Sequence, residues 1–218
     1  MVVGKQDKSK KKTPKPLIDD YHLLSYEEVD STNSEARRLA EGGASHGAFI
    51  WAKRQTQGRG RYSREWVSHE GNLFVSILLA PEEPMEQIPQ ISFISALAAA
   101  QSIAPLLPQG TTPKCKWPND LLIEGAKVAG VLLESDAGPG ERGFVIIGTG
   151  VNIISAPADT PYPATCLIEQ GFAPLAPADL LASYLQRLAG WLDRWRIQGF
   201  AEIRRAWRRH GLGLGGAV

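Results

Sequence analysis

Arg59, Arg61 and Arg64 lie within six residues of one another in a segment that reads RQTQGRGRYSREW. Arginine offers planar sets of N–H donors that match carboxylate and phosphate groups. Gly58 and Gly60 let the backbone approach a ligand closely and allow a positive φ. Like charges this close repel one another unless an anion or solvent screens them. The segment is therefore interpreted as an anion cradle, with a solvated turn and an RG-rich nucleic-acid tail as alternatives. A single copy between two strand-like runs disfavours the tail.

A second group of polar residues follows in the segment KCKWPNDLLIEGAKVAG. Trp117 and Pro118 form a rigid corner before a strand that starts near Asp120. A hairpin across a short turn would bring Lys127 of the next strand close to Asp120. Only four lysines occur after residue 16, against fourteen arginines, and three of the four lie here. A hairpin with ordinary turn residues and a surface lysine is the alternative.

The apolar pattern predicts the elements that position these residues. Strands are expected at 22–29, 48–52, 72–80, 115–117, 121–135 with a turn at Glu124–Gly125, and 143–153. A nearly wholly apolar run at 88–107, ended by Pro105, predicts a helix buried against a sheet. A helix is expected to begin with a capping box of Thr32 and Glu35 and to end at Gly42–Gly43. Two further helices are expected at 178–195 and 200–209. Together these predict one α+β domain with its helices on one side of a mixed sheet.

Composition describes an ordinary globular chain of 218 residues with 43% hydrophobic and 22% charged side chains. No apolar run of about 18 residues is present, so no membrane-spanning helix is expected. Cys115 and Cys166 form neither a disulfide framework nor a metal-ligand pattern, and the four histidines are scattered. A reducing cytoplasm is the simplest location.

The first sixteen residues carry six lysines and one acid, which leaves 18 basic and 22 acidic side chains in the rest. The segment lacks the apolar stretch of a signal peptide and cannot bury enough surface to order itself. We expect residues 1–20 to be a disordered basic leader, 21–210 to be the catalytic domain and 211–218 to be a glycine-rich tail. The acidic body argues against a dedicated nucleic-acid binder.

Five motifs occur together in one order: STN (31–33), QTQGRGRYSREW (55–66), GNLFVSILL (71–79), KWPNDLLIEGAKVAGVLLE (116–134) and GTGVNI (148–153). In this combination and spacing the chain resembles the catalytic domain of biotin protein ligases over roughly residues 22–210. The resemblance implies a mixed sheet covered by helices, the class II synthetase-like fold of biotin and lipoate ligases. It also implies that biotin and ATP, with Mg²⁺, form biotinyl-5′-adenylate, which acylates a lysine of a carrier domain.

The same resemblance assigns roles by motif. Biotin is expected to contact Ser31, Thr32, Asn33, Gln55, Gly58, Arg59, Gly60, Arg61 and Lys127. ATP is expected to contact Arg61, Arg64, Trp66, Asn119, Lys127 and Asn152. Lys127, Arg59 and Asp120 are the expected catalytic residues, with Lys127 opposing charge in the adenylation step and Asp120 orienting or accepting a proton in the transfer step. The motifs identify no metal ligands.

The expected partner is the biotin carboxyl carrier domain of acetyl-CoA carboxylase or of a related carboxylase. Specific DNA binding is not expected, because only the lysine-rich leader stands where the family often has a helix-turn-helix domain. Membrane association is not expected either, because the sequence lacks a long apolar run. The small C-terminal barrel common in the family is also expected to be absent. A homodimer is left open. The alternatives are a lipoate or octanoate ligase of the same superfamily and, in a different class, a nucleic-acid-binding module.

Overall fold

The computed structural model describes residues 22–44, 46–136, 143–172 and 176–213. Its strands are β1 (His22–Val29), β2 (Ala48–Gln55), β3 (Leu73–Leu79), β4 (Lys114–Lys116), β5 (Asp120–Ile123), β6 (Ala126–Asp136) and β7 (Phe144–Val151). Its α-helices are α1 (Thr32–Glu41), α2 (Gln90–Ile103), α3 (Pro177–Gln198) and α4 (Phe200–His210). Single 3₁₀ turns lie at Arg61–Ser63, Met85–Gln87 and Ala104–Leu106. The expected leader (1–20), residues 214–218 of the expected tail and most of the loop after β6 lie outside the described residues.

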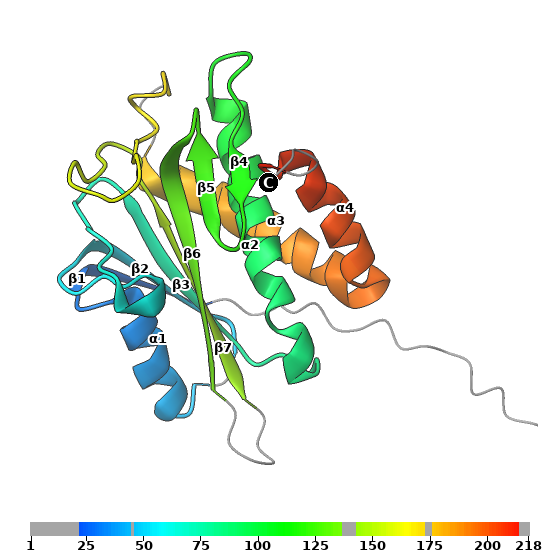
Figure 1. Cartoon of the computed structure of the whole chain (residues 1–218). Coiled ribbons are helices and arrows are strands. Elements are labelled where there is room, and N and C mark those ends of the chain that lie inside the picture. The colour runs from blue at the N-terminus through cyan, green and yellow to red at the C-terminus, as the bar shows by residue number, and fades with distance from the viewer. Residues whose placement is uncertain (1–21, 45, 137–142, 173–175, 214–218) are drawn as a thin grey trace, which may run out of the picture.

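The strands form one seven-stranded sheet in the order β1-β2-β3-β7-β6-β5-β4 (Figure 1). β1 pairs with β2 in parallel, and every other neighbouring pair is antiparallel. The predicted mixed sheet of an α+β domain is therefore confirmed. The 121–135 hairpin is confirmed as well, with β5 and β6 joined at Glu124–Gly125, both of which have positive φ.

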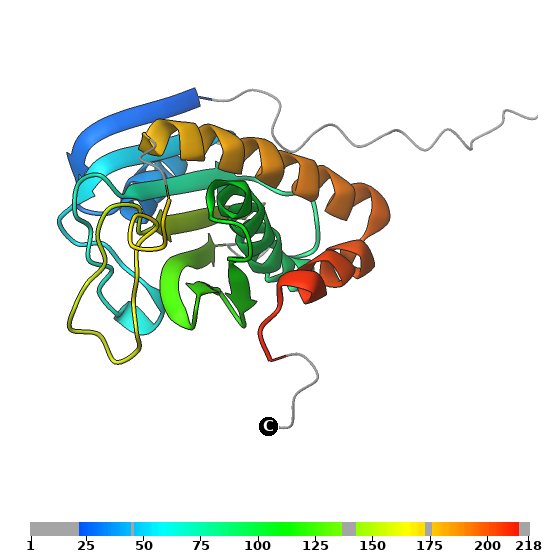
Figure 2. The same cartoon turned by 90° about the horizontal axis from the view of Figure 1, so that it is seen from above.

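The helices cover both faces of the sheet, so the prediction that they lie on one side is wrong. Side chains alternate between faces along each strand. Phe49 and Ile77 pack in the large core beneath α2, α3 and α4, whereas Ile50 and Leu78 pack with Ala36 of α1 in a separate core. Figures 1 and 2 show α2, α3 and α4 grouped together, away from α1. An apolar stripe shows that a helix packs on a sheet, but it does not say on which face.

β2 continues to Gln55, three residues beyond its expected end at Ala52. The charged pair Lys53–Arg54 suggested a loop. In the structure these side chains form ion pairs with β1, Lys53 with Glu27 at 2.9 Å and Arg54 with Glu28 at 3.1 Å. Parallel pairing with β1 thus carries the strand to Gln55, the first residue of the arginine-rich segment.

Helix α2 is buried on nearly all sides, as its apolar sequence predicts, and ends in the turn that contains Pro105. One polar contact crosses this core. The hydroxyl groups of Ser95, Thr149 and Tyr184 lie within 2.8–3.3 Å of one another. Burial raises the pKa of Tyr184 to about 12. These hydrogen bonds join α2 and α3 to β7, so they fix Thr149 in place. Its neighbours Gly148 and Gly150 line the candidate site described below.

The capping box predicted at Thr32 and Glu35 is not formed. Ser31 is the N-cap residue of α1, and neither its side chain nor that of Thr32 caps the helix. The Thr32 hydroxyl instead contacts Gln55 Oε1 at 3.1 Å, and Glu35 accepts hydrogen bonds from Tyr26 and Arg38. The polar groups at the start of α1 are used by tertiary contacts rather than by the helix end.

Candidate active site

A cavity of about 730 Å³ opens where the start of α1, the end of β2, the arginine-rich loop and strands β5, β6 and β7 meet. Nearly all the predicted site residues line it. They are Ser31, Thr32, Asn33, Gln55, Arg59, Gly60, Arg61, Arg64, Trp66, Asn119, Asp120, Lys127 and Asn152. Segments distant in sequence are therefore brought into one site, as the motifs predict.

Gly58 is the predicted site residue that does not line the cavity. A Cβ atom there would lie 2.4 Å from the Trp66 carbonyl oxygen and 2.6 Å from Ser68 Oγ, so the backbone itself is packed tightly. Its carbonyl accepts a hydrogen bond from the Trp66 amide at 2.8 Å. Gly58 thus closes the base of the loop rather than facing a ligand. The sequence suggested positive φ angles at Gly58 and Gly60. The structure has them at Tyr62 and Ser63 instead.

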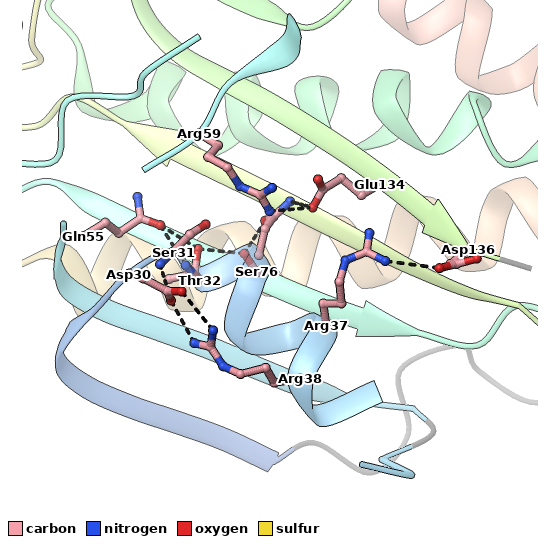
Figure 3. A network of polar contacts seen from close by, with 11 residues as sticks. Asp30, Ser31, Thr32, Arg37, Arg38, Gln55, Arg59, Ser76, Glu134 and Asp136 are labelled. Carbon is pink, nitrogen blue, oxygen red and sulfur yellow. Dashed lines mark hydrogen bonds and ion pairs between the residues drawn. The ribbon is translucent and has the colours of Figure 1, made fainter. Parts of the chain in front are cut away.

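The floor of the cavity is a chain of uncharged polar groups (Figure 3). Gln55 Oε1 accepts hydrogen bonds from the Thr32 amide at 2.8 Å and the Thr32 hydroxyl at 3.1 Å. Ser76 Oγ lies 2.7 Å from Thr32 Oγ1 and 2.5 Å from Asn33 Oδ1. Ser31, Thr32, Asn33 and Ser76 are all buried. Such a floor suits a neutral ligand group that both donates and accepts hydrogen bonds.

Three glycines form the wall on β6 and β7. A Cβ atom on Gly148 would lie 2.1 Å from Asn33 Oδ1, and one on Gly150 would lie 2.5 Å from the Trp66 ring. A Cβ atom on Gly130 would lie 3.0 Å from the same ring. The absence of side chains at these positions lets Asn33 and the indole of Trp66 rest directly on the sheet.

Lys127 is placed on the cavity by the β5–β6 hairpin, as predicted. Its Nζ lies 2.7 Å from Asp120 Oδ1 and 5.2 Å from the centroid of the Trp66 ring. The Asp120 contact is ionic rather than a well-aligned hydrogen bond, because this oxygen has no hydrogen-bond partner among the described residues. On the other side, the Lys127 amide donates to the Pro163 carbonyl at 2.7 Å. The Lys127 backbone is therefore held between Leu122 of β5 and the segment of Pro163 and Thr165.

Two asparagines link the strands to the loop. The Asn119 amide donates to the Val131 carbonyl at 2.7 Å, and its Oδ1 accepts from Arg61 at 3.4 Å. The Asn152 amide donates to the Thr165 carbonyl at 3.1 Å. Asn152 also lines the cavity, and its Oδ1 is an amide oxygen of the kind that accepts hydrogen bonds. Both asparagines thus hold neighbouring segments together while they line the cavity.

The indole of Trp66 brings an unused donor to the site. Its Nε1 is buried and has no hydrogen-bond partner in the part of the chain that the structure describes. A buried N–H group without a partner costs free energy unless a ligand or water accepts from it. Because Trp66 lines the cavity, a bound ligand can supply that acceptor.

Positive charge dominates the cavity wall. Five lining residues are cationic and three are acidic, the cations being Arg59, Arg61, Arg64, Lys116 and Lys127, and the acids Glu65, Asp120 and Asp159. The cavity thus combines a buried, uncharged, hydrogen-bonding floor with a wall whose charged side chains are mostly cationic. This arrangement fits a ligand with a polar, uncharged head and an anionic tail.

The model of the Biotin/lipoate A/B protein ligase family matches residues 26–152, more than half of the chain. The chain belongs to this family. The matched region contains the cavity floor, the arginine-rich loop, the β5–β6 hairpin and the glycines of β7.

Relatives in this family are similar over most of the chain. The chain is 40% identical over 195 residues to the biotin–[acetyl-CoA-carboxylase] ligase of Paracoccus denitrificans, covering 86% of this chain and 80% of that ligase. It is 34% identical over 199 residues to the bifunctional ligase/repressor BirA of Bacillus subtilis (strain 168), covering 89% of this chain but 61% of the relative. Its fold matches the biotin protein ligase from Aquifex aeolicus in complex with biotin and ATP with a TM-score of 0.74, at 32% identity, covering 87% and 78% of the two chains.

Several residues that line the cavity or hydrogen-bond to its lining were not predicted from the sequence. Ser76 lies in the apolar sequence of a strand, where a serine is easily taken for a small residue without a role. Glu134 lies in a motif of the hairpin but reads as a surface acid at the end of a strand. The glycines of the segment GTG were assigned to a strand without a role. A signal was available for the glycines alone, because a glycine within a strand often marks a close approach of other atoms.

Proposed function

We propose that this chain is a biotin–protein ligase. It would join biotin to ATP as biotinyl-5′-adenylate, release pyrophosphate, and then transfer biotin to one lysine of a carrier domain. The single observation that carries this proposal is the make-up of the cavity, which combines a buried neutral floor with arginines and Lys127 on its wall. Biotin has matching groups, with a ureido head that donates and accepts hydrogen bonds and a carboxylate at the end of its tail.

In the first step, a carboxylate oxygen of biotin attacks the α-phosphorus of ATP, and the bond to the pyrophosphate oxygen breaks. Two anionic groups must meet, so fixed cations are needed where they meet. Arg59 and Arg61 lie on the loop above the cavity, and Lys127 lies on its wall. We assign the two arginines to hold carboxylate and phosphate. Lys127 opposes the negative charge that grows on the α-phosphate as the new bond forms.

In the second step, the amine of a carrier lysine attacks the acyl carbon, and AMP leaves. The attacking group reaches the site as an ammonium and must lose a proton. Asp120 is the carboxylate next to Lys127 on the cavity wall, 2.7 Å from its Nζ. We assign Asp120 to orient the incoming amine or accept its proton. Trp66 and the arginine-rich loop would cover the mixed anhydride and keep water from hydrolysing it.

The residues present fit Mg²⁺ that arrives with ATP. The described residues contain no cluster of three or more His, Cys, Asp or Glu side chains that could form a dedicated metal cage. Mg²⁺ at nucleotide sites commonly needs only one or two protein oxygens besides phosphates and water. Asn152 Oδ1 and the Asp159 carboxylate, both in cavity-lining residues, could supply such oxygens. The ion, when bound, would neutralise phosphate charge.

A lipoate or octanoate ligase is the nearest competing function within the family. The cationic end of the cavity would accept either carboxylate equally well. The floor discriminates, since the head of lipoate is an apolar dithiolane and octanoate ends in a methyl group. Either would cover the polar groups of Thr32, Asn33 and Gln55 with apolar atoms that offer no hydrogen bonds in place of water, which is costly. The floor therefore favours biotin.

The carrier is proposed to be the biotin carboxyl carrier domain of acetyl-CoA carboxylase or of a related carboxylase, since the relative from Paracoccus denitrificans is named for that substrate. The proposed location is the cytoplasm, which agrees with two cysteines that are both free and buried. No helix among the described residues is long and apolar enough to cross a membrane.

The deciding experiment incubates the protein with biotin, Mg²⁺ and ATP labelled at the α-phosphate, and separates the products. We expect a labelled acyl-adenylate with biotin, and at least about tenfold less with lipoate or octanoate, the loss expected when polar groups are covered without gaining a hydrogen bond from the ligand. Addition of a biotin carboxyl carrier domain should consume the adenylate and biotinylate one lysine. Equal adenylation of lipoate would contradict the assignment of the floor, and no adenylate with any acid would contradict the ligase function.

A further inference from the structure

Glu134 of β6 holds two side chains that belong to different parts of the site. Its Oε2 accepts a hydrogen bond from Asn33 Nδ2 at 2.9 Å and lies 3.4 Å from Arg59 Nη2 (Figure 3). Asn33 lies on the cavity floor at the start of α1, and Arg59 lies on the arginine-rich loop. A single carboxylate oxygen thus joins the loop to the floor.

The contact closes a ring of polar groups that begins and ends on the loop. From Arg59 it passes through Glu134 and Asn33 to the floor, and it returns to the Trp66 carbonyl oxygen. The connecting contacts are Asn33–Ser76 at 2.5 Å, Ser76–Thr32 at 2.7 Å, Thr32–Gln55 at 3.1 Å, Gln55–Ser68 at 2.9 Å and Ser68–Trp66 at 2.9 Å. A change at Glu134 can therefore reach both ends of the loop.

Arg59 and Glu134 are joined only loosely. The ion pair spans 3.4 Å, and the side chains are 41% and 21% exposed, so solvent screens it. Within the described part of the chain, Glu134 is the only acid that forms an ion pair with Arg59. A ligand phosphate or carboxylate that reaches Arg59 can accept shorter, better-aligned hydrogen bonds. A ligand anion can therefore replace Glu134 as the partner of Arg59.

Asn33 is held much more firmly. Its Oδ1 lies 2.5 Å from Ser76 Oγ, and Gly148 leaves no space for it to shift toward β7. With Oδ1 used as an acceptor there, the Nδ2 group must donate on the opposite side. Glu134 is the acceptor on that side. Loss of this acceptor would leave a nearly buried amide without a partner and free the side chain to turn.

We propose that Glu134 is a positioning residue with two separable effects. Before ligand binds, its carboxylate stands in for the ligand anion and holds Arg59 and the loop over the cavity. The ligand anion then replaces it at Arg59, while Glu134 continues to orient the Asn33 amide toward the bound head group. The proposal rests on the proposed function, because it takes the ligand to be anionic at Arg59.

Three variants separate these effects. Glu134→Gln keeps an acceptor for Asn33 but removes the charge that attracts Arg59, and Glu134→Ala removes both. Asp136→Asn is the matched control. Asp136 lies two residues further along the same strand and pairs with Arg37 at 3.2 Å, away from the cavity lining. It loses the same charge without touching Arg59 or Asn33.

The first measurement is hydrogen exchange of the loop amides from residue 59 to 66 without ligand. We expect exchange in Glu134→Gln to be faster by about two- to fivefold, the range for one partly exposed ion pair. Asp136→Asn should exchange like wild type. Unchanged exchange in Glu134→Gln would overturn the proposal, and this arm needs no substrate.

The second measurement is the binding of biotin and of a non-hydrolysable biotinyl-adenylate analogue. Glu134→Gln should bind both at least as tightly as wild type, because the internal competitor for Arg59 is gone and Asn33 is still oriented. Glu134→Ala should bind biotin about tenfold more weakly, as expected for one misdirected hydrogen-bonding group. If Glu134→Gln weakens binding as much as Glu134→Ala, Glu134 is only structural and the proposal fails. If wild type binds neither compound, the proposed ligase function fails, and the exchange comparison still decides whether Glu134 holds the loop.

Discussion

Lys127 lies between one carboxylate and one aromatic ring at the cavity wall. Asp120 and Trp66 hold the ammonium at a fixed point without surrounding it, since the Lys127 side chain stays 31% exposed. A cation that is fixed but still open to a ligand can meet charge that develops there during a reaction. At the scale of single residues, this makes Lys127 the group on which adenylation should depend most strongly.

We predict that Lys127→Ala lowers the single-turnover rate of biotinyl-adenylate formation by about 10²- to 10³-fold, the typical loss for one such electrostatic contact. The apparent binding constants for ATP and biotin should change much less, because the charge that Lys127 opposes grows in the transition state. Lys127→Arg should restore only part of the rate, since a planar guanidinium cannot occupy the same point.

The control for Lys127 is Lys53→Ala. Lys53 is also a strand lysine in an ion pair, but it lies on β2 facing Glu27 and does not line the cavity. It should adenylate biotin at the wild-type rate. A Lys127→Ala rate within about threefold of wild type, far below the expected loss, would assign Lys127 to the surface and leave the catalytic cation unidentified.

At the scale of elements, the start of α1 must stay in place because it carries Ser31, Thr32 and Asn33 into the cavity. Asp30 anchors the start of α1 through hydrogen bonds to Ser31 and Arg38. The carboxylate accepts hydrogen bonds from the Arg38 guanidinium at 2.8 and 2.9 Å and from the Ser31 amide at 2.6 Å. The contact with Arg38 is the main cause that lowers the pKa of Asp30 to about 2, against burial, which raises it.

This shift gives a pH-dependent prediction. Because the pKa of Asp30 is lower in the folded than in the unfolded state, the stabilisation is complete above about pH 4–5 and is lost as pH falls toward 2. The side chain is 36% exposed, so we expect Asp30→Asn to lower the free energy of unfolding at pH 7 by only about 1 kcal/mol. Denaturant titrations of wild type and Asp30→Asn at pH 7 and pH 2.5 measure the difference, which should shrink at the lower pH. Glu27→Gln, whose ion pair is more exposed, should show almost no effect, and a difference independent of pH would refute the explanation.

The glycine wall of β7 gives a second element-scale prediction. Gly148→Ala would place a Cβ atom 2.1 Å from Asn33 Oδ1, so Asn33 must move. We expect a loss of about 1–3 kcal/mol in stability from the overpacking and about tenfold weaker biotin binding. Gly190→Ala is the contrasting variant, since a Cβ atom on this exposed residue of α3 meets nothing within 4 Å. It should stabilise the protein by about 0.5–1 kcal/mol and leave binding unchanged. Thermal melts and calorimetric titration with biotin check both, and tight biotin binding by Gly148→Ala would remove Asn33 from the binding floor.

At the scale of the whole molecule, the sequence predicts local pairing better than the arrangement of layers. The β5–β6 hairpin and its Lys127–Asp120 contact follow from a short turn between two apolar runs, so they could be predicted. The side of the sheet on which α1 packs could not, because an apolar stripe carries no information about which face it meets. The contacts of Thr32 and Glu134 could not be predicted either, because they depend on tertiary partners from β2, β3 and the arginine-rich loop. Local signals fail where distant segments compete for the same polar groups.

These distant segments make ligand binding a property of the entire fold. A bound biotinyl-adenylate would contact α1, β2, the loop, β6 and β7 at once, so binding to the native state alone should raise its stability. At a ligand concentration about 100 times Kd the gain is about 2.7 kcal/mol, which for a domain of this size shifts Tm upward by about 5–10 °C. We predict this shift with biotin, ATP and Mg²⁺ together, and smaller shifts with biotin or ATP alone. Octanoate with ATP and Mg²⁺ should add little to ATP with Mg²⁺, because an alkyl chain offers the polar floor no hydrogen bonds in place of water. Differential scanning fluorimetry at matched ligand concentrations is the measurement, with hydrogen exchange of residues 59–66 to show that the loop becomes protected in the same state. Equal stabilisation by octanoate would mean that the floor does not select the head group, and the ligand would then be chosen by its carboxylate and chain alone.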